Sequence, residues 1–447
     1  MEPFQSSNTA DFTKKFVILG MIFLLSTLVL GLVGALEYIF PGLLKDFFSF
    51  EKNRPMHVSA AIFWILSAAL GSVLYFLKEH NHAELKHENL VKLMFYILGF
   101  TFVIILITYA FGIFGGREYW EFHPALSIPI TVGWSLFIFV FLSNFKSLKN
   151  QPIYIWMWFT GAVFFLFTYL ESNLWLIPEV RNHLVKDMTI QWKSYGSLVG
   201  SWNMLIYGSS IYLMDKISGN KKYSFSNIAF WIFFLGLFNL MFNWGHHIYT
   251  LPTQPYVKHI GYLVSMTELL LFGRIIYLWK SSLDTAKKFS HIESYRFLLA
   301  ADVWVFLNLG LAIAMSVPAI NLYMHGTHVV VGHTMGATIG INSMLLLAFI
   351  ANIFGKNKTG EKTVKTGFWL LNISLFVFWI MLITTGFIKT YWMHKRPDFI
   401  YTELINNLRP YFYVFFVSGL VMTIGFVMII FSLLKRAVAK IANTDKQ

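Results

Sequence analysis

The sequence predicts an all-α integral membrane protein with twelve transmembrane helices. Of its 447 residues, 56% are hydrophobic and only 13% are charged, whereas ordinary soluble domains carry about 25% charged residues. Apolar runs of roughly 20 residues recur along the chain, and each is long enough to cross a hydrocarbon core about 30 Å thick. Composition and run length therefore both indicate a membrane protein.

The predicted spans are separated by short connections, so we expect residues 1–447 to form a single membrane domain. No fixed-period repeat or low-complexity segment interrupts them. The first span follows the polar stretch MEPFQSSNTADFTKK and lacks a cleavage-like small-residue site, so we interpret it as a retained span rather than a signal peptide. In chain order the predicted spans cover residues 16–38, 56–77, 91–114, 125–144, 153–177, 189–214, 225–250, 257–279, 297–318, 328–354, 367–390 and 410–434.

The net charge of +13 is distributed unevenly between the two faces of the predicted bundle. With the N-terminus in the cytoplasm, the even-numbered connections hold most of the lysines, and the connection NLYMHGTH on the other face holds none. A Lys/Arg bias of this kind sets the orientation of a membrane protein. We therefore expect both termini in the cytoplasm and relate the charge to topology rather than to nucleic acid. Random scatter of basic residues is the alternative.

The chain contains no cysteine. This excludes Cys-ligated iron–sulfur clusters, thiolate copper sites and covalently attached c-type haem within the chain. If the protein performs electron chemistry, the electrons must come from a partner.

Residues that can bind metals lie on separate predicted spans but at similar depth. At a rise of 1.5 Å per residue they all fall in the outer half of the bilayer, with Glu268 about eleven residues, or roughly 16 Å, below the start of its span. Ionisable residues inside a membrane are functional candidates by default. The residues are His57, Glu171, His246, His247, Glu268, His333 and Met335.

Each of these residues, taken alone, has a simpler structural explanation. A lone histidine can bond a carbonyl group of a neighbouring helix, Met335 can fill a gap in the core, and Glu268 can be protonated or paired with an arginine. The adjacent His246 and His247 are harder to explain by packing, because two imidazoles near a helix end can converge on one ion. Imidazole suits iron, copper and zinc, and a carboxylate adds a preference for iron.

The segment VVVGHTMGATIG places His333 and Met335 two residues apart. Residues at that spacing on a regular helix point about 200° apart, so these two side chains cannot bind the same metal. They could instead serve two different haems. Met335 would pair with His57 across one haem, and His333 would hold a second haem whose other face stays open for substrate. The nearby glycines suit the close approach of a flat macrocycle, or plain helix packing.

This constellation resembles the haem–copper oxidase superfamily, and within it the catalytic cytochrome b subunit of nitric oxide reductase. The segment GREYWEFHP is similar to that family's Gly-Arg-Glu-aromatic-x-Glu motif. The resemblance implies that Glu118 binds a structural calcium and that Glu121 is a nearby carboxylate for proton uptake. It also implies that His57 ligates a low-spin haem b, that His333 ligates a high-spin haem b, and that His246 and His247 ligate a non-haem iron close to Glu268, or copper as in oxidases.

The reaction implied by this resemblance joins two NO molecules with two electrons and two protons to give N2O and water. Two adjacent metal centres would make N–N bond formation effectively intramolecular, and carboxylates such as Glu268 would relay protons. The expected electron donor is a membrane-anchored cytochrome c subunit, and the expected location is the bacterial inner membrane. The alternatives are an NO dismutase, which forms N2 and O2, an O2-reducing terminal oxidase and, last, a twelve-span secondary transporter.

Two departures from the family pattern affect the predicted site. The family has histidine where this chain has Met335, so the low-spin haem would have His/Met ligation. The sixth span, with the sequence QWKSYGSLVGSWNMLIYG, also lacks the third metal-binding histidine, the Glu four residues after it, and the His-x-x-x-Tyr arrangement of oxidases. Candidates for the missing ligand include water, and the residues considered are Glu171, Tyr195, Ser197, Ser201, Asn203 and Glu268.

Overall fold

The computed structural model describes residues 11–264, 267–355, 358–396 and 398–444, which form helices joined by short loops with no β-strand. In chain order the helices are α1 (Phe12–Ile39), α2 (Phe50–Asn81), α3 (Glu88–Ala110), η1 (Pro124–Leu126), α4 (Ser127–Ser143), α5 (Ile153–Glu171), η2 (Leu174–Leu176), α6 (Pro178–Arg181), α7 (Leu184–Ser218), α8 (Asn227–Phe242), η3 (Asn243–Ile248), α9 (Pro255–Val264), α10 (Thr267–Ser282), α11 (Thr285–Ser290), α12 (Ile292–Ser316), α13 (Pro318–Met324), α14 (His328–Met335), η4 (Gly336–Ser343), α15 (Met344–Phe354), α16 (Lys358–Lys395) and α17 (Tyr401–Thr444).

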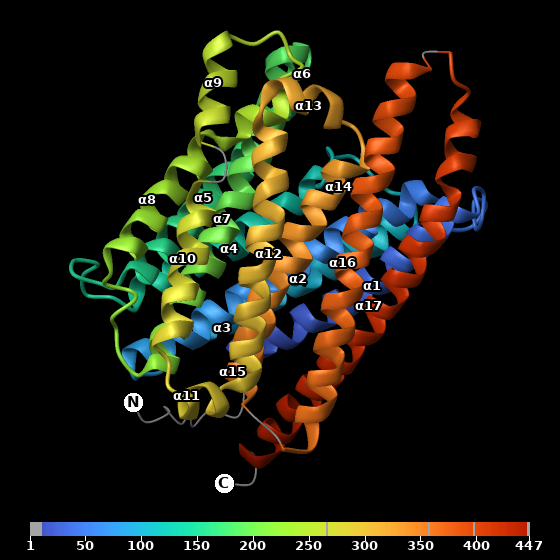
Figure 1. Ribbon diagram of the computed structural model, residues 1–447. Helices are drawn as coiled ribbons and strands as arrows, with labels where there is room; N and C mark the ends of the chain where they lie inside the picture. Colours follow the sequence, from blue (N-terminus) through green and yellow to red (C-terminus); the bar gives the residue numbers. More distant parts are fainter. Residues whose placement is uncertain (1–10, 265–266, 356–357, 397, 445–447) are drawn as a thin grey trace.

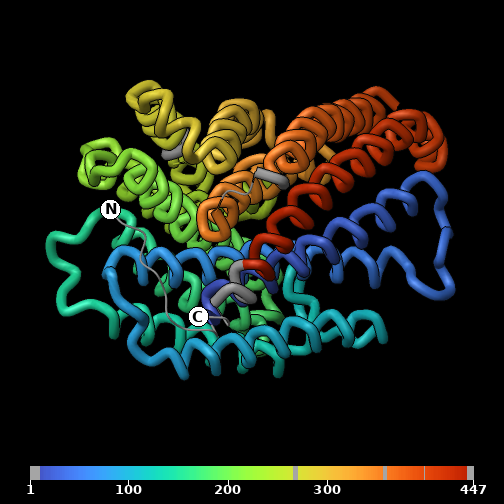
Figure 2. Tube along the Cα trace, turned by 90° about the horizontal axis from the view of Figure 1, so that it is seen from below, coloured from blue at the N-terminus to red at the C-terminus, as the bar shows by residue number. Residues whose placement is uncertain are grey.

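The long helices run side by side between two ends of the bundle (Figure 1). The start of α1 and the end of α17 lie at one end, here termed the inner end, together with α11. The short helices α6, α9 and α13 lie at the opposite, outer end. Seen from below, α1 to α5 lie along one side, α8 to α10 along a second, and α16 and α17 along a third (Figure 2).

The predicted all-α membrane fold is confirmed, with two differences in the helix pattern. Among the described residues, ten helices are long and apolar enough to cross a membrane. The sixth predicted span is the 35-residue helix α7, which is not among those ten because polar and charged residues interrupt its apolar sequence. The predicted span 257–279 corresponds to two helices, α9 and α10, on either side of residues 265–266, which lie outside the described residues.

Two of the spans lie at the centre of the bundle. In α2, 89% of the most apolar window is buried, and in the continuous run α14–η4–α15 the share is 78%, against 33–61% in the other eight spans. Helices that are hydrophobic all round are expected to be surrounded by protein or lipid. The burial shows that these two are surrounded by protein. They carry His57 and the pair His333 and Met335, so the candidate site lies on the most enclosed helices.

The helix that carries this pair changes its geometry directly after Met335. Residues His328–Met335 form a regular α-helix and residues Gly336–Ser343 form a π-helix. The hydroxyl of Ser343 donates to the Thr338 carbonyl at 2.8 Å within this wider segment. π-helical turns are rare and frequent at functional sites. Because both candidate ligands precede the π segment, the expected separation of about 200° between their directions applies to them.

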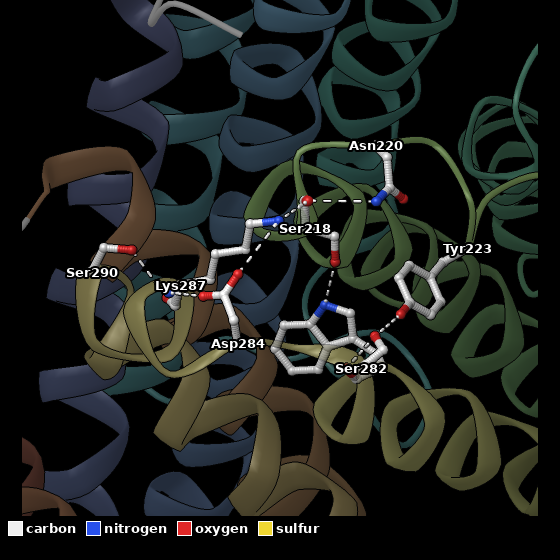
Figure 3. A network of polar contacts seen from close by, with 8 residues as sticks. Ser218, Asn220, Tyr223, Ser282, Asp284, Lys287 and Ser290 are labelled. Carbon is white, nitrogen blue, oxygen red and sulfur yellow. Dashed lines mark hydrogen bonds and ion pairs between the residues drawn. The ribbon is translucent and has the colours of Figure 1, made fainter.

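A polar network around Ser218 ties α10 and α11 to the inner end of α7 (Figure 3). The Lys287 ammonium donates to the Ser218 carbonyl at 2.8 Å, and the Trp279 indole N–H donates to the Ser218 hydroxyl at 3.0 Å. The hydroxyl groups of Tyr223 and Ser282 bond one another beside it. A cation at a helix C-terminus also complements the helix dipole. These contacts fix the inner half of α7.

Candidate functional site

His57 lies in a seat formed by α1. Its Nδ1 is 2.9 Å from the Thr27 carbonyl oxygen, which makes Nδ1 the protonated nitrogen and leaves Nε2 free as an acceptor. A Cβ at Gly31 would lie 2.9 Å from the His57 ring, so only glycine leaves room for this imidazole. A ligating histidine usually donates its other ring N–H to a carbonyl or carboxylate. These contacts therefore suit a histidine whose Nε2 would hold a haem.

His333 and Met335 point to opposite flanks of α14. The side of the helix between them is formed by small residues: a Cβ at Gly332 would contact α16, and one at Gly336 would contact Asn308 of α12. His333 is half-buried and its Nδ1 is buried without a hydrogen-bond partner. Met335 is half-buried and packs against the main core. This arrangement fits the predicted use of the two side chains on two haems, one on each flank.

His246 and His247 form a pair in η3, directly after α8. Their ring centroids are 4.1 Å apart and the planes are inclined by 40°. The indole of Trp192, from α7, stacks on His247 with centroids 5.4 Å apart and planes within 13°. His333 lies close enough to interact electrostatically with both His246 and His247. The fold thus brings together histidines from two predicted spans, although His333 lies 86 and 87 residues after His247 and His246 in the chain.

The face of α7 that meets this pair carries no metal ligand. A Cβ at Gly196 would lie 3.8 Å from Cδ2 of His247 but only 3.0 Å from the Trp244 Cβ. A larger residue at position 196 would therefore displace Trp244. One turn further on, a Cβ at Gly200 would meet Leu240 of α8 at 3.0 Å. Glycine in place of a ligand allows α8 and η3 to pack closely against α7.

Two of the polar candidates on α7, Ser201 and Asn203, make side-chain hydrogen bonds to other residues. Ser201 faces α5, since its backbone carbonyl oxygen would lie 2.6 Å from a Cβ added at Gly161. Its hydroxyl donates to the backbone carbonyl of the buried Ser197. Asn203 accepts a hydrogen bond from Asn342 at 3.1 Å.

Tyr195 packs edge-on to Tyr119, with ring centroids 5.4 Å apart. No group of three His, Asp or Glu side chains close enough to hold a metal ion occurs among the described residues. Glu268 begins α10, but its side chain lies outside the described part.

The carboxylates proposed for calcium and proton uptake instead surround Arg54, one turn before His57 on α2. The Arg54 guanidinium pairs with Glu118 and donates to Glu121 Oε1 at 3.2 Å. A guanidinium beside both carboxylates favours an ion pair over calcium at Glu118. Burial raises the pKa of the Glu121 carboxyl, although Arg54 partly opposes the shift. Glu171, another candidate ligand, pairs with Lys193.

Several residues of this site are not recognisable as functional from the sequence. The Thr27 carbonyl and Gly31 belong to an apolar helix, and nothing in the sequence relates them to His57. Trp192 and Gly196 likewise gain their roles only through packing on His247. Arg54 has a detectable signal: NRPMH places a cation three residues before a candidate ligand, on the same membrane face as the acidic motif GREYWEF.

Comparisons with known proteins agree with this architecture. The family model described as "Cytochrome C and Quinol oxidase polypeptide I" matches residues 11–421. A nitric oxide reductase subunit of Stutzerimonas stutzeri is 22% identical, over 97% of this chain and 95% of that protein. The cbb3-type cytochrome c oxidase subunit CcoN1 of the same organism is also 22% identical, over 94% and 93%. A solved haem–copper terminal oxidase dimer shares the fold with a TM-score of 0.74 at 16% identity, covering 95% of this chain and 83% of that one.

The fold and the histidine arrangement thus define a multi-pass membrane oxidoreductase of the haem–copper oxidase superfamily. The chain belongs to the cytochrome c and quinol oxidase polypeptide I family. Members of this family bind haems and a copper or iron centre. Reductase and oxidase relatives are equally similar to this chain, so its substrate has to be argued from its own site.

Proposed function

We propose that this chain is the catalytic subunit of a nitric oxide reductase-like enzyme, which reduces two NO to N2O and water with two electrons and two protons. The observation that carries the proposal is the face of α7 at the histidine pair. It presents Gly196 to His247 and has no His-x-x-x-Tyr arrangement of the kind found in oxidases. The absence of this arrangement separates the predicted site from that of an O2 reductase, whereas glycine at position 196 departs from the histidine of both patterns.

The proposed roles follow the positions of the side chains. His57 and Met335 hold a low-spin haem b, and His333 holds a high-spin haem b. His246 and His247 supply two ligands to a non-haem iron, and the described residues supply no third, so no reaction step is assigned to that ion. The haems supply electron transfer and a binding position for a diatomic gas. The protein's contribution is to orient the imidazoles and to keep the site enclosed.

Glu121 and Glu268 are the proposed proton carriers. Glu121 suits this role because its pKa is raised by burial, so that its carboxyl remains protonated at higher pH than an exposed one. Arg54 holds one of its oxygens, while Oε2 is buried without a hydrogen-bond partner. Glu268 lies at the start of α10, and its role rests on the family resemblance.

The electrons are proposed to come from a membrane-anchored cytochrome c subunit, since the chain has no cysteine for a covalently attached haem or an iron–sulfur cluster. The complex is placed in the bacterial inner membrane as a single twelve-helix domain, with both termini in the cytoplasm. A calcium ion at Glu118 would have to compete with the Arg54 guanidinium, which already pairs with that carboxylate.

An NO dismutase is the second candidate, favoured by the loss of ligands on α7. An O2-reducing oxidase is the third, because a cbb3-type relative is equally similar. Secondary transport is not proposed, since the chain belongs to a family of oxidoreductases.

The deciding experiment is gas analysis on the purified detergent-solubilised complex, supplied with isotopically labelled NO with and without a reduced donor. Labelled N2O that appears only with the donor supports the reductase. Labelled N2 together with O2, independent of the donor, supports the dismutase and overturns the proposal. Consumption of O2 with the donor but not of NO would identify an oxidase.

A further inference from the structure

A buried polar seam lies behind the helix that carries His333 and Met335. It is formed by α12 and α16, on the side of α14 that lies between the two candidate ligands. Asn308 of α12 is fully buried, and neither its Oδ1 nor its Nδ2 has a hydrogen-bond partner. The indole nitrogen of Trp379, from α16, is also buried without a partner. Buried polar groups in native proteins are nearly always satisfied, so these three atoms require an explanation.

The unpartnered atoms converge on one point of the ligand helix. A Cβ at Gly336 would lie 2.5 Å from Asn308 Oδ1 and 3.2 Å from Trp379 Nε1. Gly336 follows Met335 directly and is the first residue of the π-helical segment. The Asn308 amide therefore packs directly on Gly336, with an acceptor and a donor side by side at the junction between two helical geometries.

The same two helices are joined directly one layer closer to the inner end. There the Trp304 indole N–H donates to Asn372 Oδ1 at 3.1 Å, and the Trp304 ring covers Gly340. The seam thus has two similar Trp–Asn layers, each over a glycine of the ligand helix. The inner layer is closed by a hydrogen bond, whereas the layer of Asn308 and Trp379 has none.

We propose that a water molecule beside Gly336 bridges the Asn308 amide and the Trp379 indole, and that this bridge positions Met335. The water accepts from the Trp379 N–H, donates to Asn308 Oδ1 and has Asn308 Nδ2 as a further neighbour. Two to four polar partners are what a buried water needs. Because the Asn308 amide packs directly on Gly336, a bridge that holds this amide also restrains the rotation of the helix at residue 336. Because Met335 and His333 lie on opposite flanks, such a rotation sets the directions of both.

The positioning role rests on the proposed function, in which Met335 is the axial ligand of the low-spin haem. The test uses the purified haem-loaded complex and three variants: Asn308→Leu, Trp379→Phe and Gly336→Ala. Asn308→Leu keeps the volume but removes both polar atoms, Trp379→Phe removes the donor, and Gly336→Ala places a methyl group that displaces the Asn308 amide. Gly310→Ala on the same helix as Asn308 is the matched control, since a Cβ there meets nothing within 4 Å.

Two readouts follow each variant. A cryo-EM map is expected to show a water between Asn308 and Trp379 in the parent and in Gly310→Ala, and its loss in the three variants. The optical spectrum and midpoint potential of the low-spin haem are expected to shift in the same three. Asn308→Ser, which retains a polar group and leaves room for water, is expected to restore the parent spectrum.

An empty position in the parent map, or parent-like spectra in all three variants, would overturn the inference. Failure of the proposed function is recognised separately by Met335→Leu. If that variant leaves the low-spin haem unchanged, the axial assignment is wrong. The inference is then judged by the map alone, through the water and the direction of residue 335 in Asn308→Leu.

Discussion

At the scale of single residues, the candidate ligands differ in how fully their surroundings prepare them. His57 has a carbonyl partner for Nδ1, and its ring packs on Gly31, which has no side chain in the way, so its tautomer and ring position are set by α1. His333 has a buried Nδ1 with no partner. Fixing the second ring nitrogen orients a ligand and raises its basicity. The site thus combines one pre-oriented imidazole with one that is less constrained.

Met335 gives the most direct test at this scale. Replacing Met335 by histidine is expected to change the low-spin haem from His/Met to bis-His ligation, and thus to lower its midpoint potential, because thioether ligation raises it. The change should also alter the optical spectrum. Redox titration of the purified complex measures both effects. A titration curve identical to that of the parent would show that Met335 only fills the core.

Glu121 predicts a pH dependence. Burial raises the pKa of its carboxyl above the ordinary value, so the protonated form persists to higher pH. If this form delivers protons, the rate is expected to fall as pH rises through that raised pKa. Glu121→Gln should lower the rate and abolish this alkaline limb in steady-state NO consumption. Glu179→Gln, at an exposed position of α6, is the control, and persistence of the limb in Glu121→Gln would exclude the role.

At the scale of elements, the packing of α7 leaves no room for a side chain beside the proposed metal ligands His246 and His247. Its inner half is fixed by the Ser218 network, and its outer half places Gly196 and Gly200 against η3 and α8. The close packing of these helices therefore depends on having glycine at positions 196 and 200. A histidine at position 196, as a third ligand of the proposed metal, would be incompatible with this packing.

This packing predicts that the family ligand cannot simply be restored. In Gly196→His the new Cβ would lie 3.0 Å from the Trp244 Cβ, and overpacking of this kind costs roughly 1–3 kcal/mol. We expect a lower thermal unfolding temperature and no gain in bound iron per haem. Gly310→Ala, which adds a Cβ in open space, should leave both values unchanged. A stable variant with an additional equivalent of iron would show that η3 can move away.

The sequence predicts helices well where one apolar run is long enough to span the membrane. It predicts them less well where polar residues interrupt the run. The run 328–354 is predicted with its boundaries because it is predominantly apolar and carries no Asp, Glu, Lys or Arg, and the structure agrees. The span 257–279 is predicted as one helix, but Gly261 packs against Gly245 and the described residues form two helices. The π segment after Met335 is not predicted, since it depends on contacts with α12 and α16.

At the scale of the whole molecule, the candidate site can be predicted from sequence only in part, for a physical reason. Histidines at similar depth on different spans identify His57, His246, His247 and His333, because depth follows from chain position. Lateral neighbours do not follow from it. The fold alone brings Trp192 to His247, Arg54 to the acidic loop and Asn308 to Gly336. The sequence therefore predicts the depth of each side chain in the membrane, whereas helix packing determines which side chains it contacts.

A buried ion pair at the inner end of the bundle joins its last helix, α17, to α12. Arg436 of α17 donates to Glu293 of α12 through Nη1 at 2.5 Å and Nη2 at 2.9 Å, and Nη1 also donates to the Gly355 carbonyl at the end of α15 at 2.8 Å. Both side chains are 4% exposed. The pair thus joins α17 to the core helices below the site.

Breaking this pair on one side leaves a buried charge without a partner, which typically costs about 3–5 kcal/mol. We therefore expect Arg436→Met to lower the thermal unfolding temperature of the detergent-solubilised protein strongly. The double variant Arg436→Met/Glu293→Gln should recover much of the loss, because removing both charges removes the desolvation penalty as well. Equal destabilisation by the single and double variants would show that the guanidinium acts through Gly355 and packing instead. The bond to Glu293 would then contribute little to holding α17 on the bundle.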